Sequence, residues 1–332
     1  MFKVIILTEG NVQTGFGHVM RCLSLYQAFN ALGILAKFIV FGDGTVKHAL
    51  EGVDHDFINW VESPHLIDYY LTTAKVAIID SYIAQLSTYE AIANRVPLVV
   101  FLDDYKRLNY PRGIVLNASA DASCLSYPEH IGFQYMLGVS YALLRKEFWS
   151  VTEKQVNQVI ENVMVTVGGE DSQNITPCLL RCLVDHFPHL NKKVVIGKGF
   201  NNVEDIEGAA DSNTTLIFNS DARMMKNLII DSDIAICGGG QTIYELAVCG
   251  TPAIVVALAK NQVNNIAGLL KLGFIDYAGW YNDKDYLMNI TYCIQRLRDY
   301  RVRLEKSRLG RSLIDGRGPL RVAEYINTLV NN

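Results

Sequence analysis

The sequence has no excess of positive charge and no long apolar run. Its 332 residues include 30 Lys and Arg against 34 Asp and Glu, a formal net charge of −4, which argues against a basic surface for nucleic acid. The longest apolar run, residues 251–259, fits a buried strand and is much shorter than the roughly 18 residues that a membrane-spanning helix needs. Residues 1–7 form a short strand pattern without a cleavage-type region, so we expect no signal peptide.

Cysteine pairs and metal-binding spacings are also missing. None of the seven cysteines belongs to a CxxC pair or to a His/Cys cluster with zinc spacing. Several lie in apolar stretches, as buried free thiols do in a reducing cytosol, and we therefore expect a cytoplasmic protein. Asp103-Asp104 has the acidic character of a metal site but no accompanying Asp-x-Asp, so we predict no bound metal there.

Two nucleotide-binding motifs are absent as well. Gly15-Phe16-Gly17 lacks the third glycine of the dinucleotide fingerprint, because position 20 is Met20, and this disfavours a nicotinamide or flavin enzyme. The chain has no G-x-x-x-x-G-K-[ST] sequence, which excludes ATP hydrolysis of the P-loop kind.

The sequence has enough hydrophobic residues to form two large hydrophobic cores. Hydrophobic residues make up 50% and charged residues 19% of the chain, and its length suits two domains. In the first half, continuously apolar runs alternate with helical periodicity, which is typical of a parallel sheet covered by helices on both faces. We expect strands at residues 3–7, 37–41, 76–79, 98–102 and 114–117, and helices at residues 18–32, 46–51, 63–73, 87–95 and near Pro128.

The second half opens in the same way, with a strand, a glycine turn and a helix. We expect strands at residues 162–167, 193–196, 215–218, 234–237 and 253–256, and helices at residues 174–186, 221–231, 242–249, 261–272, 283–313 and 317–332. Residues 137–161 form the crossing between the halves, and their second part is compatible with a helix. The pattern predicts two Rossmann-like domains, residues 1–150 and 151–332, which face a central cleft, and the last helix is a candidate to cross back to the first domain.

His18 lies where the first strand passes to the first helix. A lone histidine in a turn is often a surface or capping residue. Here it follows Gly15-Phe16-Gly17 at the carboxyl edge of a parallel sheet, where open α/β folds bind ligands. A neutral imidazole at such a place suits a general base.

Polar side chains follow two further strands of the first half. Asp80-Ser81-Tyr82 comes directly after residues 76–79, and Asp103-Asp104-Tyr105 directly after residues 98–102. Asp and Ser at such positions commonly cap helices or form turns. The same side chains also suit two other tasks, the orientation of a histidine and the binding of sugar hydroxyls.

Two glycine turns open helices in the second half. Gly168-Gly169 precedes Glu170-Asp171, and Gly238-Gly239-Gly240-Gln241-Thr242 precedes a helix that contains Glu245. Close backbone packing alone explains many glycine turns. Backbone N–H groups at such turns also bind a diphosphate without a lysine, and Glu245 is placed to accept hydrogen bonds from ribose hydroxyls.

The order of these motifs resembles one enzyme family. Residues 239–262, with Gly-Gly, Thr, Glu-Leu-Ala, Gly-Thr-Pro and Asn-Gln in this order, resemble the nucleotide-sugar site of GT-B glycosyltransferases, including the N-acetylglucosaminyl transferase of peptidoglycan synthesis. The first part of the chain, together with the glycine turn at Gly168-Gly169, resembles the UDP-2,4-diacetamido-2,4,6-trideoxy-β-L-altropyranose hydrolases of pseudaminic acid biosynthesis. The motifs that carry this second resemblance are Gly15-Phe16-Gly17-His18-x-x-Arg21-Cys22, Asp80-x-Tyr82, Leu102-Asp103-Asp104, Leu116-Asn117, Gly138-x-Ser140-Tyr141-Ala142-Leu143-Leu144-Arg145-x-Glu147-Phe148 and Gly168-Gly169-x-Asp171-x-x-Asn174.

The resemblance implies a GT-B fold and a hydrolase that releases UDP without a sugar acceptor, in the biosynthesis of cell-surface glycans. It implies that His18 activates water at the anomeric carbon and that Tyr82 lies near the same sugar as a second catalytic residue. No metal or other cofactor is needed, and the partner is a small nucleotide sugar. The expected substrate-binding residues are Gly17, Arg21, Asp80, Asp104, Gly168, Gly169, Asp171, Asn174, Gly239, Gly240, Gln241, Thr242, Glu245, Asn261 and Gln262.

One departure from the family pattern leaves alternatives open. The family often has Arg-x-Asp after the first strand, where this chain has Thr8-Glu9-Gly10, so a related deoxyamino sugar or another nucleotide remains an option. A GT-B glycosyltransferase with a UDP-sugar donor is the alternative function. A binding module without activity and a Rossmann oxidoreductase rank below both, and the pattern favours no particular oligomeric state.

Overall fold

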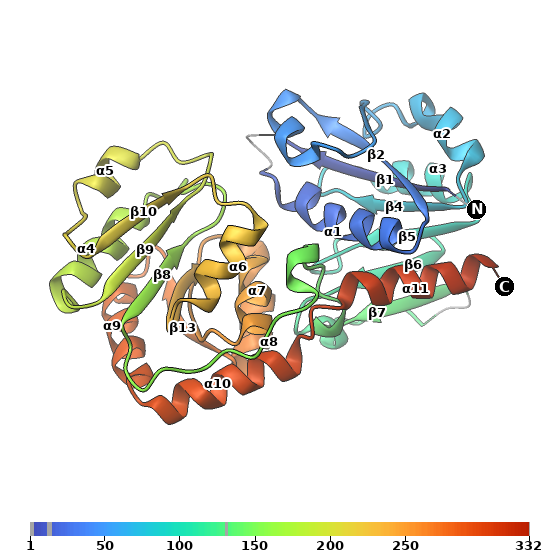
Figure 1. Ribbon diagram of the computed structural model, residues 1–332. Helices are drawn as coiled ribbons and strands as arrows, with labels where there is room; N and C mark the ends of the chain where they lie inside the picture. The colour runs from blue at the N-terminus through green and yellow to red at the C-terminus, as the bar shows by residue number, and fades with distance from the viewer. Residues whose placement is uncertain (1–2, 12–14, 130–131, 332) are drawn as a thin grey trace. The chain divides into compact units, whose positions relative to one another are not determined.

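The computed structural model describes residues 3–11, 15–129 and 132–331. The chain divides into two compact units, the first made of residues 1–146 and 317–332 and the second of residues 147–316. Each unit has its own sheet with helices around it, which confirms the predicted pair of parallel α/β sheets (Figure 1). The first unit ends at residue 146 instead of 150, and it includes the last helix of the chain.

The first unit is built on a parallel sheet in the order β3-β2-β1-β4-β5-β6-β7. Its strands are β1 (Lys3–Gly10), β2 (Leu35–Gly42), β3 (His55–Phe57), β4 (Val76–Asp80), β5 (Leu98–Leu102), β6 (Gly113–Asn117) and β7 (Phe133–Leu137). Its α-helices are α1 (Gly17–Ala31), α2 (Asp68–Thr73), α3 (Leu86–Ala93) and α11 (Gly318–Asn331). The strand order reverses between β1 and β4, and such a switch point is where open α/β sheets bind ligands.

Helices cover both faces of this sheet, which explains why its central strands are continuously apolar. Ile5 and Leu7 of β1 share a buried cluster with Leu71 of α2 and Ile92 of α3. Alternate residues of a strand point to opposite faces, and helix α1 packs on β1, β2 and α11. Figure 1 shows α11, in red, running beside α1.

The second unit has the strand order β10-β9-β8-β11-β12-β13, with parallel pairing between neighbours. Its strands are β8 (Asn162–Thr166), β9 (Asn191–Ile196), β10 (Thr214–Phe218), β11 (Ile234–Gly238), β12 (Ala253–Ala257) and β13 (Ile275–Trp280). Its α-helices are α4 (Thr176–His186), α5 (Val203–Glu207), α6 (Ala222–Ile230), α7 (Thr242–Cys249), α8 (Val263–Lys271), α9 (Tyr286–Leu297) and α10 (Tyr300–Leu313). The switch point of this sheet lies between β8 and β11.

The sequence pattern does not predict three of the strands, and all three lie at a sheet edge. β3 and β7 form the two edges of the first sheet, and β13 forms one edge of the second. Their positions are partly exposed, in contrast to the buried central strands. An edge strand is covered less completely than a central one, so its sequence lacks the uninterrupted apolar run that reveals the others.

Two helix predictions are wrong for reasons that the structure makes clear. The single helix expected over residues 283–313 is two helices, because the side chain of Asp299 accepts a hydrogen bond from the N–H of Arg301 at 2.8 Å and starts α10. Residues 152–161 form no helix. Their polar side chains bond to distant parts of the second unit instead, as Lys154 does to Thr251 at 2.8 Å and Asn157 to Asp233 at 2.8 Å.

Two short helix predictions in the first half also need correction. No helix surrounds Pro128 among the described residues, and the nearest helical turn is the 3₁₀ segment Ala122–Cys124. The helix expected over residues 46–51 is a 3₁₀ helix, Gly44–Leu50, whose start is capped by Asp43. Short helical connectors often take this tighter form, with hydrogen bonds between residues three positions apart.

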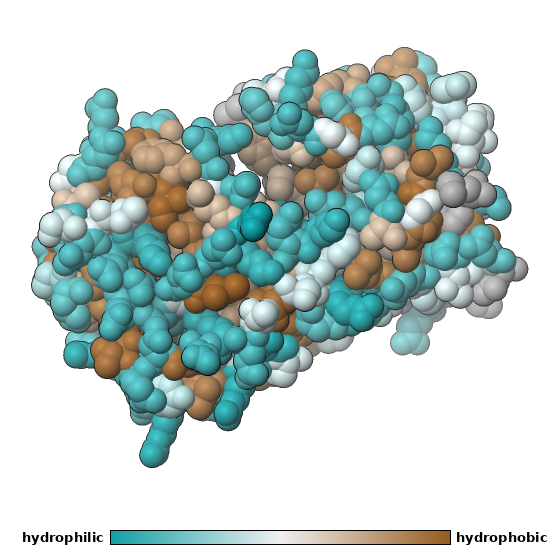
Figure 2. Space-filling view, in the orientation of Figure 1, coloured by the Kyte–Doolittle hydropathy of each residue, from teal (hydrophilic) through white to brown (hydrophobic). Residues whose placement is uncertain are grey.

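The surface is mostly polar where it is visible. On the face shown in Figure 2, hydrophilic residues predominate and apolar residues appear in small groups, as expected when the apolar residues fill the two cores. In the described part of the chain, no helix combines the length and the apolar character needed to cross a membrane.

Candidate active site

The switch point of the first sheet gathers five of the residues predicted from the sequence. His18 and Arg21 lie in the first turns of α1, and Asp80 is the last residue of β4. Tyr82 follows two positions later, and Asp104 comes just after β5. Because β1, β4 and β5 are parallel neighbours, their carboxyl ends bring these side chains to one edge of the sheet.

His18 and Asp80 form a buried hydrogen-bonded pair. Nδ1 of His18 lies 2.7 Å from Oδ1 of Asp80, and the two residues are 7% and 0% exposed. A carboxylate only accepts hydrogen bonds, so the proton of a neutral His18 belongs on Nδ1 and the lone pair on Nε2. Arg21 Nη2 also approaches Nδ1, but at 3.3 Å it is the weaker neighbour.

Arg21 holds the two carboxylates of the site together. Its Nε and Nη2 donate to the two oxygens of Asp80 at 2.5 and 2.6 Å, and its Nη1 donates to both oxygens of Asp104 at 2.8 Å. Burial by itself raises the pKa of Asp80, but the guanidinium of Arg21 and the imidazole of His18 hold it well below its usual range. Asp80 is therefore a carboxylate at neutral pH.

Tyr82 packs against the histidine. Its ring meets that of His18 edge to face, with centroids 4.4 Å apart and an interplanar angle of 87°. Its hydroxyl donates to Oδ2 of Asp104. Burial and the charge of Asp104 raise the pKa of Tyr82, so the side chain is a neutral phenol that fixes the imidazole plane.

Glu9 belongs to the same cluster, although sequence reasoning gave it no role. It lies near the end of β1 and is 1% exposed. Its Oε1 accepts the N–H of Tyr82 at 2.8 Å, and its Oε2 accepts the hydroxyl of Ser81. On the far side of the imidazole, Oε1 lies 4.0 Å from Nε2 of His18. The sequence contains a signal for this position, because Glu9, like Asp80, is an acid at the tip of a strand.

Gly17 begins α1 directly before His18 and is exposed. A Cβ built on it would meet no atom within 4 Å, so packing does not require glycine here. Gly15, two positions earlier, has a φ of 75°, which an L side chain adopts only with strain. Glycine at position 15 is therefore needed for the turn, and Gly17 leaves open space beside His18.

In the second unit, the turn after β8 contains four of the predicted binding residues. Gly168 and Gly169 are exposed, and Gly168 has a φ of 121° that favours glycine. Asp171 is buried and accepts the N–H groups of Ile175 and Thr176 at 3.0 and 2.9 Å, at the start of α4. Its carboxylate thus caps that helix.

Asn174 stands beside this cap. It has a positive φ of 51°, and its side-chain oxygen accepts a hydrogen bond from Asn202 at 2.6 Å. Asn202 also donates to Asp171 at 2.9 Å. These contacts fix the shape of the glycine turn, whose backbone is the exposed part.

The turn after β11 leads into α7 at the switch point of the second sheet. Gly240 and Gln241 are exposed, and Thr242 is the first residue of α7. Glu245 lies in the first turn of this helix and is 4% exposed. The free N–H groups at a helix start attract an anion, so this turn has the chemistry that a phosphate group needs.

Gln262 shapes this turn from the next loop. Its side-chain oxygen accepts the N–H of Gly239 at 3.1 Å and that of Leu258 at 3.0 Å. A Cβ on Gly239 would lie 2.8 Å from the Cβ of Gln262 and 2.6 Å from Cδ1 of Ile266, so glycine is required there. Asn261, immediately before Gln262, is exposed.

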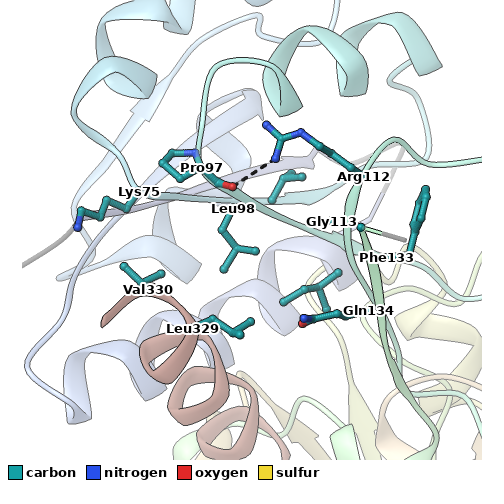
Figure 3. Close-up of a pocket in the computed structure, with 12 residues that line it drawn as sticks. Lys75, Pro97, Leu98, Arg112, Gly113, Phe133, Gln134, Leu329 and Val330 are labelled. Carbon is teal, nitrogen blue, oxygen red and sulfur yellow. Dashed lines mark hydrogen bonds between the residues drawn. The ribbon is translucent and has the colours of Figure 1, made fainter. Parts of the chain in front are cut away.

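A pocket in the first unit lies at the amino ends of the strands, opposite to His18. It has a volume of about 470 Å³, and its lining includes Leu98, Gly113 and Phe133, which begin β5, β6 and β7 (Figure 3). Arg112, also in the lining, donates to the carbonyl oxygen of Pro97 at 3.4 Å. The amino ends of the strands face this pocket, whereas His18 and its partners lie at the carboxyl ends.

The residues that the structure describes include no group of three or more His, Cys, Asp or Glu side chains suited to a metal ion. Within the His18 cluster, the two aspartates are occupied by Arg21. What the cluster provides is a histidine with an oriented lone pair, and this is the chemistry of a general base.

Known proteins resemble this chain in fold and in part of its sequence. Residues 162–285 match the model of the glycosyltransferase family 28 C-terminal domain, a segment that contains both glycine turns of the second unit. The crystal structure of MurG from Acinetobacter baumannii is similar over 99% of this chain and 100% of its own, with a TM-score of 0.73 and 15% identity. The fold is GT-B-like.

Two curated relatives resemble the GT-B-like chain in sequence. An uncharacterized protein of Methanocaldococcus jannaschii is 26% identical over 277 residues, which cover 79% of this chain and 56% of the relative. A protein of Helicobacter pylori is 23% identical over 266 residues, which cover 78% of this chain and 45% of the relative. Its name gives two activities, pseudaminic acid cytidylyltransferase and UDP-2,4-diacetamido-2,4,6-trideoxy-β-L-altropyranose hydrolase. The chain thus spans about half the length of these relatives.

Proposed function

We propose that this chain is a nucleotide-sugar hydrolase. Its substrate is a UDP-linked 2,4-diacetamido-2,4,6-trideoxy sugar, and its products are UDP and the free sugar, for the biosynthesis of a pseudaminic-type nonulosonic acid. The observation that carries the proposal is the buried pair of His18 and Asp80, which directs the lone pair of Nε2 away from the carboxylate. The second activity in the name of the Helicobacter pylori relative supports the same reaction.

In the proposed reaction, His18 acts as the general base. Nε2 takes a proton from a water molecule while the water oxygen forms a bond to the anomeric carbon. The bond from that carbon to the UDP oxygen breaks, and its electron pair leaves with UDP. Asp80 stabilises the imidazolium that forms, because it already accepts the proton on Nδ1.

The second unit supplies the groups for the leaving nucleotide. We assign the diphosphate to the backbone of Gly168, Gly169, Gly239 and Gly240, and to Gln241 and Thr242 at the start of α7. The family 28 match over residues 162–285 supports this assignment. N–H groups at a helix start stabilise the negative charge that develops on UDP as the bond breaks.

The remaining assignments concern the ribose and the sugar. We assign Glu245 to the ribose hydroxyls and Asn261 to the sugar or the phosphate. Asp171, Asn174 and Gln262 act through the loops that they hold, as their hydrogen bonds support. These are binding roles, and no step of the reaction runs through a metal.

A glycosyltransferase is the second candidate. The match to the glycosyltransferase family 28 C-terminal domain and the structural similarity to MurG favour it. A transferase releases UDP slowly in water and much faster when an acceptor is present, whereas a hydrolase needs water alone.

The experiment that separates the two candidates is UDP release from a panel of UDP-linked deoxyamino sugars, with no acceptor and no added metal. The hydrolase proposal predicts fast release from at least one diacetamido sugar. Measurable binding of UDP without release from any member of the panel would overturn the proposal and direct the search to acceptors.

A further inference from the structure

Two hydrogen-bond acceptors flank the place where the proposed base meets its water. One is Nε2 of His18, whose other ring nitrogen is bonded to Asp80. The other is Oε1 of Glu9, which lies 4.0 Å from Nε2. Glu9 is 1% exposed and cannot move aside easily, because Tyr82 N–H and Ser81 hydroxyl both donate to its carboxylate.

Nε2 of His18 and Oε1 of Glu9 do not form a hydrogen bond with each other, since a neutral imidazole with its proton on Nδ1 has only a lone pair on Nε2. Both can accept from one molecule between them. If a water oxygen lies about 2.8 Å from each atom, the angle from Nε2 through the water oxygen to Oε1 is about 90°. This is close to the angle between the two O–H bonds of water. Oε1 retains room for this bond, because a carboxylate oxygen accepts two hydrogen bonds.

We propose that Glu9 and His18 together bind the attacking water and select it over an alcohol. This inference rests on the proposed hydrolase function. Water donates two hydrogens and satisfies both acceptors. An alcohol has a single hydroxyl hydrogen, so its binding leaves one lone pair without a donor, either on Nε2 of His18 or on Oε1 of Glu9, and a buried acceptor that lacks a hydrogen bond is costly. Glu9 is thus the residue that makes the site a hydrolase.

The reaction keeps the second hydrogen bond throughout. The hydrogen on the His18 side passes to Nε2, and the water oxygen bonds to the anomeric carbon. The hydrogen on the Glu9 side stays on that oxygen and becomes the hydroxyl hydrogen of the free sugar. UDP leaves with the electron pair of the broken bond, so Glu9 gives and takes no proton.

The test is a competition between water and methanol. The wild type and its variants are incubated in mixed methanol and water with the panel sugar that the wild type cleaves fastest. The ratio of methyl glycoside to free sugar is then measured by mass spectrometry. This ratio does not depend on the overall rate, so a variant with a merely weakened fold leaves it unchanged.

The wild type should form methyl glycoside at least about tenfold less than the mole ratio of the two solvents predicts. Glu9→Leu removes the acceptor, and Glu9→Asp draws it back by one methylene group. Both should raise the ratio by about tenfold or more. Glu9→Gln should stay within about threefold of the wild type, because its amide oxygen can replace Oε1 as the acceptor for the N–H of Tyr82 and for water.

Ser81→Ala is the matched control, since it removes the partner of Oε2 while the N–H of Tyr82 still holds Oε1 in place. It should keep the ratio of the wild type. If Glu9→Leu does not fold, the ratios measured for Glu9→Asp and for the wild type still test whether Glu9 selects water. A wild type that follows the solvent mole ratio, or a Glu9→Asp enzyme that cleaves with an unchanged ratio, would overturn the inference while the hydrolase function stands. Absence of UDP release from the wild type would instead overturn the proposed function, and this inference with it.

Discussion

Nδ1 of His18 lies 2.7 Å from Oδ1 of Asp80, although 62 positions separate the two residues in the sequence. The contact exists because β1 and β4 are parallel neighbours and the helix after β1 starts at the edge where β4 ends. A buried carboxylate on one ring nitrogen orients the lone pair of the other.

Asp80→Asn should cost most of the activity. Asparagine keeps the size of the side chain but removes the charge that orients the imidazole and stabilises the imidazolium, so we expect UDP release to fall by about 100-fold or more. UDP binding, assigned to the other unit, should stay within a few fold. Steady-state kinetics and calorimetric titration with UDP measure the two effects.

Asp54→Asn is a control for the loss of an ion pair as such. Asp54 pairs with Lys37 at 2.6 Å, but its side chain is 60% exposed. Exposed pairs contribute about 1 kcal/mol or less, and we expect normal UDP release from this variant. Equal activity of the two variants would contradict the role given to Asp80.

The free energy of unfolding should fall in acid, partly because of Asp80. Burial raises the pKa of this carboxyl, but Arg21 and His18 together hold it well below its usual range. The unfolded chain takes up the proton near its ordinary pKa of about 3.9, while the folded protein does not. Unfolded chains then bind more protons than folded ones, so stability is lost as the pH falls below about 4.

Urea unfolding between pH 3 and pH 6 measures this loss. Asp80→Asn removes the titrating group, and its free energy of unfolding should therefore decline less steeply with acid than that of the wild type. Parallel curves for the two proteins would show that Asp80 has the same pKa in both states.

The aromatic ring of Tyr82 should matter more than its hydroxyl. The ring packs on His18, whereas the hydroxyl donates to Asp104, which Arg21 also holds. Tyr82→Phe keeps the ring, so we expect it to lose less than tenfold in the rate of UDP release and about 1 kcal/mol of stability. Tyr82→Ala frees the imidazole plane and should lose considerably more. A Phe variant as impaired as the Ala variant would mean that the hydroxyl itself contacts the substrate.

Neighbouring glycines of the second unit should respond differently to alanine. A Cβ on Gly239 would lie 2.6 Å from Ile266 and 2.8 Å from Gln262, whereas a Cβ on Gly240 would meet nothing within 4 Å. Gly239→Ala should therefore lower the free energy of unfolding by about 1–3 kcal/mol. Gly240→Ala should leave it within about 0.5 kcal/mol.

Titration with UDP extends this comparison to binding. If the turn holds the diphosphate, the Cβ of Gly240→Ala points into the space that the ligand needs, and UDP binding should weaken in both variants. Unchanged UDP binding in both would remove the turn after β11 from the proposed site.

The sequence predicts the central strands of both sheets closely, since burial on both faces requires continuous apolar runs such as Leu98–Leu102. Edge strands such as His55–Phe57 are partly exposed and carry no such run. The polar segment at residues 152–161 has helix-compatible composition, but it forms no helix and Lys154 makes tertiary hydrogen bonds instead. Contacts between distant residues decide these cases, and a local pattern does not contain them.

In the site too, local sequence patterns predict some residues, while contacts between distant residues determine the rest. His18, Asp80 and Asp104 could be predicted because each stands at the tip of an apolar strand or directly after a glycine turn. The pairing of Arg21 with both aspartates depends on the order of strands in the sheet, which the sequence does not specify. Glu9 stands where the family pattern has a different residue, and only its buried contacts with the turn after β4 reveal its place.

The central claim is that His18 activates water, and one comparison tests it most directly. UDP release in water alone is measured for the wild type and for His18→Ala, each with its UDP affinity. We predict that the wild type releases UDP from a diacetamido sugar and that His18→Ala loses nearly all turnover while its UDP affinity stays within a few fold. A His18→Ala enzyme that releases UDP at the wild-type rate would contradict the account.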